Sequence, residues 1–152
     1  NINKDFEFKE GNFNQLVYWM NREIIDEYPL ELKSPVDWTD ETKDINDRVR
    51  SYLDVNCGHC HSPTGNANST GLYLHLNETR DIHLGKYKKP VATGRGSGGL
   101  KYSIVPGKPE ESILLHRMAS MDPGVMMPES GRALTHEEAV DMVREWILLM
   151  QN

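Results

Sequence analysis

The only two cysteines of the 152-residue chain lie three positions apart and are followed at once by a histidine, in the run Cys57-Gly58-His59-Cys60-His61. The spacing C-x-x-C-H is the pattern of c-type haem attachment. Two thiols one helical turn apart can each add to a vinyl group of one porphyrin, and the adjacent histidine can then direct its imidazole at the iron. The motif therefore predicts one covalent haem c held by Cys57 and Cys60, with His61 as an iron ligand and no cysteine left for a disulfide.

Two other kinds of site could use the same cysteine pair. A thiol–disulfide oxidoreductase would place a reactive thiolate at a helix N-terminus, directly after a buried strand. Here residues 45–53 instead carry apolar side chains at helical spacing, so the pair follows a helix. A structural zinc site needs four ligands, and His75, His83 or His116 would have to complete it at no familiar spacing. Both alternatives fit the sequence less well than a haem.

A second axial ligand is expected from the methionine-rich residues 118–128. Met127 is the preferred candidate, because Pro128 fixes its own φ and holds the preceding residue out of the α region, in a loop that can present a sulfur. Met126 is the alternative methionine. A histidine could also ligate, from among His75, His83, His116 and His136. Histidine ligation would give a lower reduction potential, because methionine raises it.

Several segments together resemble a class I c-type cytochrome domain. They are residues 50–61 with the cysteine motif, Val105-Pro-Gly-Lys-Pro-Glu-Glu-Ser112, Arg117-Met118-Ala-Ser120 and Met126-Met127-Pro128. The likeness is greatest to the branch found as the C-terminal haem module of larger secreted bacterial proteins, and it covers about residues 46–150. Residues 76–104 depart from it, being longer and richer in glycine than in compact members.

This resemblance implies a mostly α, cytochrome c-like helical fold around one covalent haem, with Cys57 and Cys60 linked and His61 and Met127 axial. It implies one-electron transfer to a redox partner protein or a fused upstream domain, rather than catalysis. It also implies a periplasmic or extracellular location. Anchoring to a surface through a segment outside this chain is a further possibility. A thiol–disulfide oxidoreductase, or a peroxidase-like enzyme with an open sixth position, is the alternative function.

Charge and hydropathy exclude two classes of partner. Residues 1–46 carry 11 acidic and 5 basic side chains and so hold all of the formal net charge of −6. Residues 47–152 carry equal numbers of acidic and basic side chains, so the chain has no net basic excess to neutralise phosphates, and no nucleic-acid partner is expected. No apolar run approaches the roughly 20 residues that cross a bilayer, so no transmembrane segment is predicted.

The chain is expected to divide into residues 1–43, an N-terminal helix with an acidic extended linker that could end an upstream domain, and residues 44–152, the monohaem domain. Helical spacing predicts helices over 12–27, capped by Asn12, and over 44–57. A third helix is expected to start at Pro109 and a last one at a Thr135–Glu138 capping box.

The last predicted helix repeats apolar residues at helical spacing, at Ala139, Val143, Trp146, Ile147 and Met150. This stripe should pack against the helix that leads into the cysteine motif.

A local basic stretch, residues 85–101, contains five basic side chains and no acidic one. As a hypothesis, it could attract an acidic redox partner to the haem edge, or place Arg95 near a haem propionate.

Overall fold

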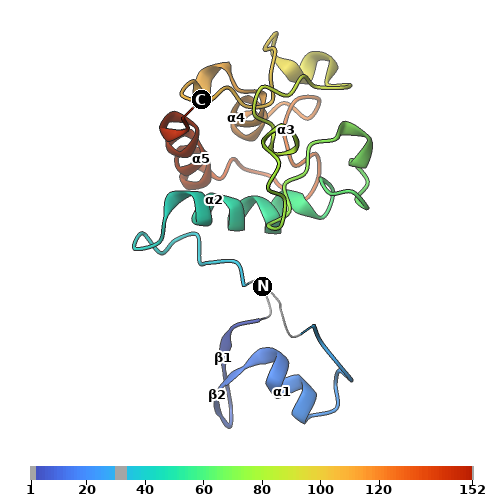
Figure 1. The fold of residues 1–152 in the computed structure, drawn as a ribbon, viewed down its shortest axis with the longest axis vertical. Helices are drawn as coiled ribbons and strands as arrows, with labels where there is room; N and C mark the ends of the chain where they lie inside the picture. The colour runs from blue at the N-terminus through green and yellow to red at the C-terminus, as the bar shows by residue number, and fades with distance from the viewer. Residues whose placement is uncertain (1–2, 30–33, 152) are drawn as a thin grey trace. The chain divides into compact units, whose positions relative to one another are not determined.

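The computed structural model describes residues 3–29 and 34–151 and divides into two compact units, Asn1–Pro35 and Val36–Asn152 (Figure 1). The sequence placed this boundary eight residues later, after residue 43. Residues 36–43 belong with the second unit because Trp38 packs against its core. The Val36 N–H also donates to Ser51 Oγ at 2.9 Å.

The first unit is a β-hairpin followed by a short helix. Strand β1 (Asp5–Phe8) pairs antiparallel with β2 (Gly11–Asn14) in a register that places Phe6 opposite Phe13. Helix α1 (Gln15–Asn21) follows directly. The stacked rings of Phe8 and Tyr18, with centroids 3.7 Å apart, join the hairpin to this helix.

The helix predicted over residues 12–27 was wrong at both ends. Residues 11–14 form β2 because their backbone pairs with β1, a contact that helical spacing cannot reveal. The cap is Asn14, not Asn12, and its side chain accepts hydrogen bonds from the N–H groups of Leu16 and Val17. The helix ends at Asn21, well before Pro29.

In the second unit, the helix expected before the cysteines is confirmed. Helix α2 (Ile45–Leu53) begins after Asp44, whose carboxylate accepts from the Asn46 N–H at 2.8 Å. It continues without a break into a π-helical turn, Asp54–Gly58, that contains the first cysteine. A wider turn of this kind is frequent at functional positions in helices.

The other helices of this unit are short except the last. They are α3 (Asp81–Leu84), α4 (Ile113–Ala119), α5 (Glu137–Leu149) and the 3₁₀ turns Asn68–Thr70, Gly94–Ser97 and Pro109–Glu111. Within the described residues, the second unit has no strands, only the isolated bridges Lys86–Ile104 and Tyr102–Ser112. A cytochrome c-like fold stays a prediction for this unit, and the hairpin of the first unit was not foreseen.

Two predicted helix starts differ from the structure. Pro109 opens a 3₁₀ turn, and Ser112 is extended before α4 begins, because its hydroxyl accepts from the Val105 N–H and donates to the Lys108 carbonyl. The Thr135 capping box does not form: α5 follows His136, with no side-chain capping bond.

The core of the second unit lies between α2, α4 and α5 (Figure 1). The predicted stripe of α5 is buried at Ala139, Val143, Trp146 and Ile147, and it shares one apolar cluster with Val49 and Leu53 of α2. Trp146 Nε1 also donates to Asn46 Oδ1 at 3.1 Å. The packing of this stripe against the helix that leads into the motif is therefore confirmed.

A buried polar cluster ties the loop after the cysteine motif to α2. Arg50 is only 8% exposed, and its Nη2 donates to the carbonyls of His75, Leu76 and Glu78 at 2.8–3.1 Å. The buried Glu78 carboxylate in turn accepts from the Arg80 guanidinium, at 2.7 and 2.8 Å. These bonds hold residues 75–80 in place beside the helix.

The Glu78 carboxylate is expected to make the fold sensitive to acid. Its hydrogen bond with Arg80, with contributions from backbone N–H groups, lowers its pKa from 4.5 to about 2. The folded state thus binds fewer protons than the unfolded state, so this stabilisation is present above about pH 4.5 and is lost as pH falls towards 2. Glu78→Gln should lower the melting temperature at neutral pH. Between about pH 4.5 and 2, the melting temperature of this variant should fall less steeply with pH than that of the wild type.

Glu41→Gln, at an exposed position, is the control. If the melting temperature of Glu78→Gln fell with pH as steeply as that of the wild type, the prediction would be contradicted.

Among the described residues, no helix combines the length and the apolar character needed to cross a bilayer.

Candidate functional site

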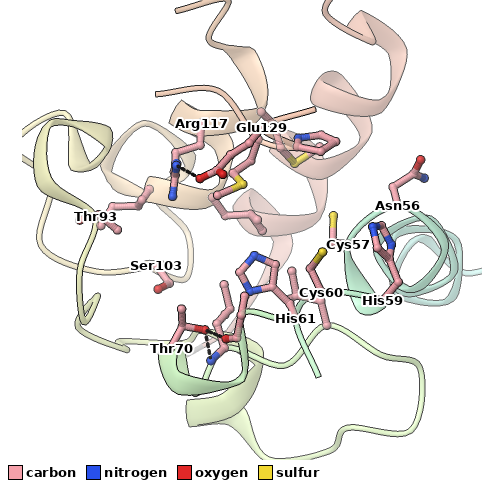
Figure 2. A pocket seen from close by; sticks show the side chains of 18 of the residues that line it. Asn56, Cys57, His59, Cys60, His61, Thr70, Thr93, Ser103, Arg117 and Glu129 are labelled. Carbon is pink, nitrogen blue, oxygen red and sulfur yellow. Dashed lines mark hydrogen bonds and ion pairs between the residues drawn. The ribbon is translucent and has the colours of Figure 1, made fainter. Parts of the chain in front are cut away.

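A cavity of about 1050 Å³ lies in the second unit and is lined by residues from widely separated segments. Cys57, Cys60, His61 and Met127, the four residues predicted to hold a haem, all line it. Figure 2 shows the cysteine pair and His61 grouped at one side of this space. Its volume is at the upper end of the roughly 300–1000 Å³ typical of ligand pockets.

The end of α2 positions the cysteine motif. After the π-helical turn, the Cys60 and His61 N–H groups both donate to the Cys57 carbonyl, at 3.1 and 2.8 Å. One helical turn therefore separates the two thiols, as attachment to a single ring requires. Both cysteines are partly buried, and both line the cavity.

The His61 ring is suited to be a neutral ligand. Burial lowers its pKa, and the nearby Leu72 backbone opposes this only in part, so the imidazole is uncharged at neutral pH. Its Nδ1 is buried and makes no hydrogen bond of good geometry to the described residues. A histidine binds a metal through a neutral ring nitrogen, which this environment favours.

The electrostatics of Cys57 oppose its use as the thiolate of a thiol–disulfide oxidoreductase. Burial, and secondarily the neighbouring Cys60, raise the pKa of the Cys57 thiol to about 12. A dithiol oxidoreductase depends on a thiolate stabilised at a helix N-terminus, where the pKa is lowered. Cys57 has the opposite environment, at the C-terminal end of its helix.

The loop after α4 brings Met127 to the cavity. Its N–H donates to the Arg117 carbonyl at 3.0 Å, which fixes the loop against the helix. Met126 does not line the cavity, whereas Met118 of α4, which the sequence analysis did not single out as a ligand, does. The structure thus separates the two neighbouring methionines that the sequence left open.

The structure also distinguishes among the four histidines that were alternative ligands. His136 lines the cavity, and its Nδ1 lies 3.0 Å from the Tyr52 hydroxyl. His75, His83 and His116 do not line it. Within residues 3–29 and 34–151, no three His, Cys, Asp or Glu side chains gather as a group that could hold a metal ion, so no candidate zinc site accompanies the cysteines.

Basic side chains line the cavity, but Arg95, the arginine predicted to lie near a propionate, is not among them. Arg95 pairs with Asp122 at 3.0 Å, is 70% exposed and does not line the cavity, contrary to the hypothesis that places it near a propionate. Lys88 of the basic stretch lines it instead, and so do two further cations, Arg117 and Arg132. Sequence reasoning did not assign these two arginines a role, although Arg117 stands inside one of the segments that carried the cytochrome resemblance.

Comparisons of the chain with protein-family models, with curated proteins and with solved structures found no match. The function of this site must therefore be inferred from the chemistry of its own residues.

Proposed function

We propose that this chain binds one haem c covalently in the cavity and serves as a one-electron carrier. The observation that carries the proposal is that Cys57, Cys60, His61 and Met127 line a single cavity of about 1050 Å³. Met127 is 66 residues from His61 in the sequence, so nothing in the local spacing of either motif brings them together. A paired thiol, an imidazole and a thioether around one large space are the attachment groups and axial ligands of a c-type haem.

The cavity wall also fits a large apolar ring with a polar edge. Apolar side chains from the π-helical turn, α4, α5 and the loops line it, among them Val55, Leu72, Leu74, Ile113, Leu114, Met118 and Val140. Polar and cationic groups are present as well, in Thr93, Ser103, Arg117 and Arg132. A porphyrin has this division, an apolar macrocycle with two carboxylates.

Each residue of the site has a distinct task. Cys57 and Cys60 retain the group by thioether bonds, so that it is not lost when redox partners exchange. His61 and Met127 supply one nitrogen and one sulfur ligand. When bound there, a haem would supply the one-electron chemistry through its ferric and ferrous states. The buried walls limit solvent access, which tunes the reduction potential.

The partners and location proposed with this function follow the cytochrome resemblance. The electron donor or acceptor is a redox partner protein or a domain fused upstream, and the location is periplasmic or extracellular, where this type of haem attachment takes place. The steering hypothesis for residues 85–101 is weakened, because Lys86 pairs with Asp81 at 3.0 Å and Arg95 with Asp122. These ion pairs neutralise part of the basic stretch.

The first experiment is the visible spectrum of the protein, oxidised and reduced, after export with haem maturation present. A pyridine haemochrome assay and the mass of the denatured protein accompany it. One covalent haem per chain supports the proposal, and a far-red sulfur-to-iron band supports methionine ligation. Haem without that band would favour a histidine ligand or a peroxidase-like site. A colourless protein with two titratable thiols would overturn the proposal and favour a thiol–disulfide oxidoreductase.

Met127→Leu is expected to abolish the far-red band and to lower the midpoint potential, because methionine ligation raises it. The matched control is Met126→Leu, which changes the neighbouring methionine that does not line the cavity. The control should keep both the band and the potential. If Met126→Leu lost the band and Met127→Leu kept it, the ligand assignment would be wrong; Met118→Leu tests the other sulfur in the cavity wall.

A further inference from the structure

The Arg117 side chain is a cation enclosed within the cavity wall. It extends from α4, and only 17% of the side chain is exposed. Its Nε donates to the Val125 carbonyl at 2.8 Å. A Cβ on the buried Gly96 would lie 3.3 Å from Arg117 Cζ, so a glycine at that position leaves room for the guanidinium. Backbone from two loops therefore holds this group in a set orientation.

The charge of Arg117 is poorly compensated by the protein. Its ion-pair partner among the described residues is Glu129, at 4.0 Å, and that side chain is 71% exposed (Figure 2). A buried charge is costly unless it is well paired. The site thus favours a further anion beside this guanidinium.

Arg132, the other arginine in the wall, has both of its terminal nitrogens engaged, although its buried Nε has no partner among the described residues. Its two terminal nitrogens donate to the carbonyls of Met118 and Ser120. It fastens its loop to the end of α4. Arg117 also lines the cavity, and among the described residues its Nη2 has Glu129 as its ion-pair partner, at 4.0 Å. Arg117 is therefore the better placed of the two to bind a ligand.

The position of Arg117 relative to the cysteines identifies the anion. Figure 2 shows its guanidinium across the pocket from Cys57 and Cys60, on the side where Thr93 also lies. In a protoporphyrin, the two vinyl groups that bind thiols and the two propionate carboxylates lie at opposite edges of the ring. A ring attached to the cysteines would present its carboxylates towards the far side of the cavity.

We propose that Arg117 binds a propionate carboxylate of the haem, an inference that rests on the proposed function. A guanidinium suits this task, because its planar fork of donors matches the two oxygens of a carboxylate. The Val125 carbonyl and the space at Gly96 orient that fork before the ligand binds. Arg117 would thus keep the carboxylate ionised inside a largely enclosed site.

The test is the midpoint potential of the haem-loaded protein as a function of pH, for the wild type, Arg117→Gln, Arg117→Lys and Arg95→Gln. Removing the guanidinium should raise the pKa of the redox-linked carboxyl group by about 1–3 units, the usual effect of an adjacent opposite charge. The potential of Arg117→Gln should be lower than that of the wild type at pH values above this pKa and should rise as pH falls through it. Arg117→Lys should restore part of the wild-type profile.

Arg95→Gln removes an exposed positive charge that is paired with Asp122 and lies outside the cavity wall, so its profile should match the wild type. The other titratable groups in the wall remain in every variant; they are Tyr52, His59, Lys88, Glu129, Arg132 and His136. Because Glu129 pairs with Arg117, removing the guanidinium also changes the surroundings of this carboxylate. The double variant Arg117→Gln/Glu129→Gln should therefore keep the shifted titration of Arg117→Gln, and loss of that titration would assign it to Glu129 and overturn the proposal.

An Arg117→Gln profile equal to that of the wild type would overturn the proposal, and so would an equal shift in Arg95→Gln. If Arg117→Gln does not accumulate with haem, Arg117→Lys decides: a shift in the same direction supports the proposal, and an unchanged profile overturns it. Every comparison requires a wild type that carries haem. A wild type without haem contradicts the proposed function itself, which keeps the two failures distinct.

Discussion

Replacing Cys57 and Cys60 together by serine should give a colourless chain whose second unit has no cooperative melting transition. The reason is the size of the cavity: about 1050 Å³ lies within a unit of 117 residues. Folded domains of this size are stable by only about 5–15 kcal/mol, and a large apolar ring at the centre supplies much of the burial that the chain lacks by itself. Thermal unfolding followed by circular dichroism measures the effect.

His59→Ala is the matched control for the double serine variant. His59 stands inside the same motif and at the same cavity wall, but its ring is not a predicted ligand. The control should retain one covalent haem and a melting temperature close to that of the wild type. A near-native, cooperative melt of the double serine variant would show that the chain folds without the group, and would contradict the stabilising role assigned to haem.

Trp146→Ala should destabilise the second unit by about 3–5 kcal/mol, the range for removing a buried aromatic side chain. The ring is only 5% exposed and belongs to the core cluster shared by α2 and α5. The substitution would leave a cavity and would also remove the donor to Asn46 Oδ1, present at 3.1 Å. Denaturant unfolding of the haem-loaded protein measures the change as a shift of the midpoint.

Leu148→Ala is the control on the same helix, because its side chain is 58% exposed. An exposed position of this kind usually changes stability by no more than about 0.5 kcal/mol. An unchanged midpoint for Trp146→Ala, or an equal change in both variants, would contradict the assignment of this face of α5 to the core.

The spacing of apolar residues was sufficient to predict the buried side of a helix that packs against one core. The spacing of Val143, Trp146 and Ile147 correctly predicted the buried side of α5, because a helix repeats its direction every 3.6 residues whatever it packs against. The helix before Cys57 was located for the same reason. Helical spacing could not predict the hairpin, because the hairpin depends on the contact of β1 with β2. It could not predict the extended Ser112 either, because the Ser112 hydroxyl is held by hydrogen bonds to the backbone of Val105 and Lys108.

The sequence by itself determined the chemistry predicted for the site, because Cys57, Cys60 and His61 are adjacent and their spacing alone defines the attachment pattern. Only the tertiary structure decided which distant side chains share the cavity with them. It selected Met127 over Met126, and Arg117 over Arg95, as residues of the wall. Neighbouring residues in a loop have nearly the same sequence context. The hydrogen bonds of the folded loop determine which side chain lines the cavity, among them those from the Met127 N–H to the Arg117 carbonyl and from Arg117 Nε to the Val125 carbonyl.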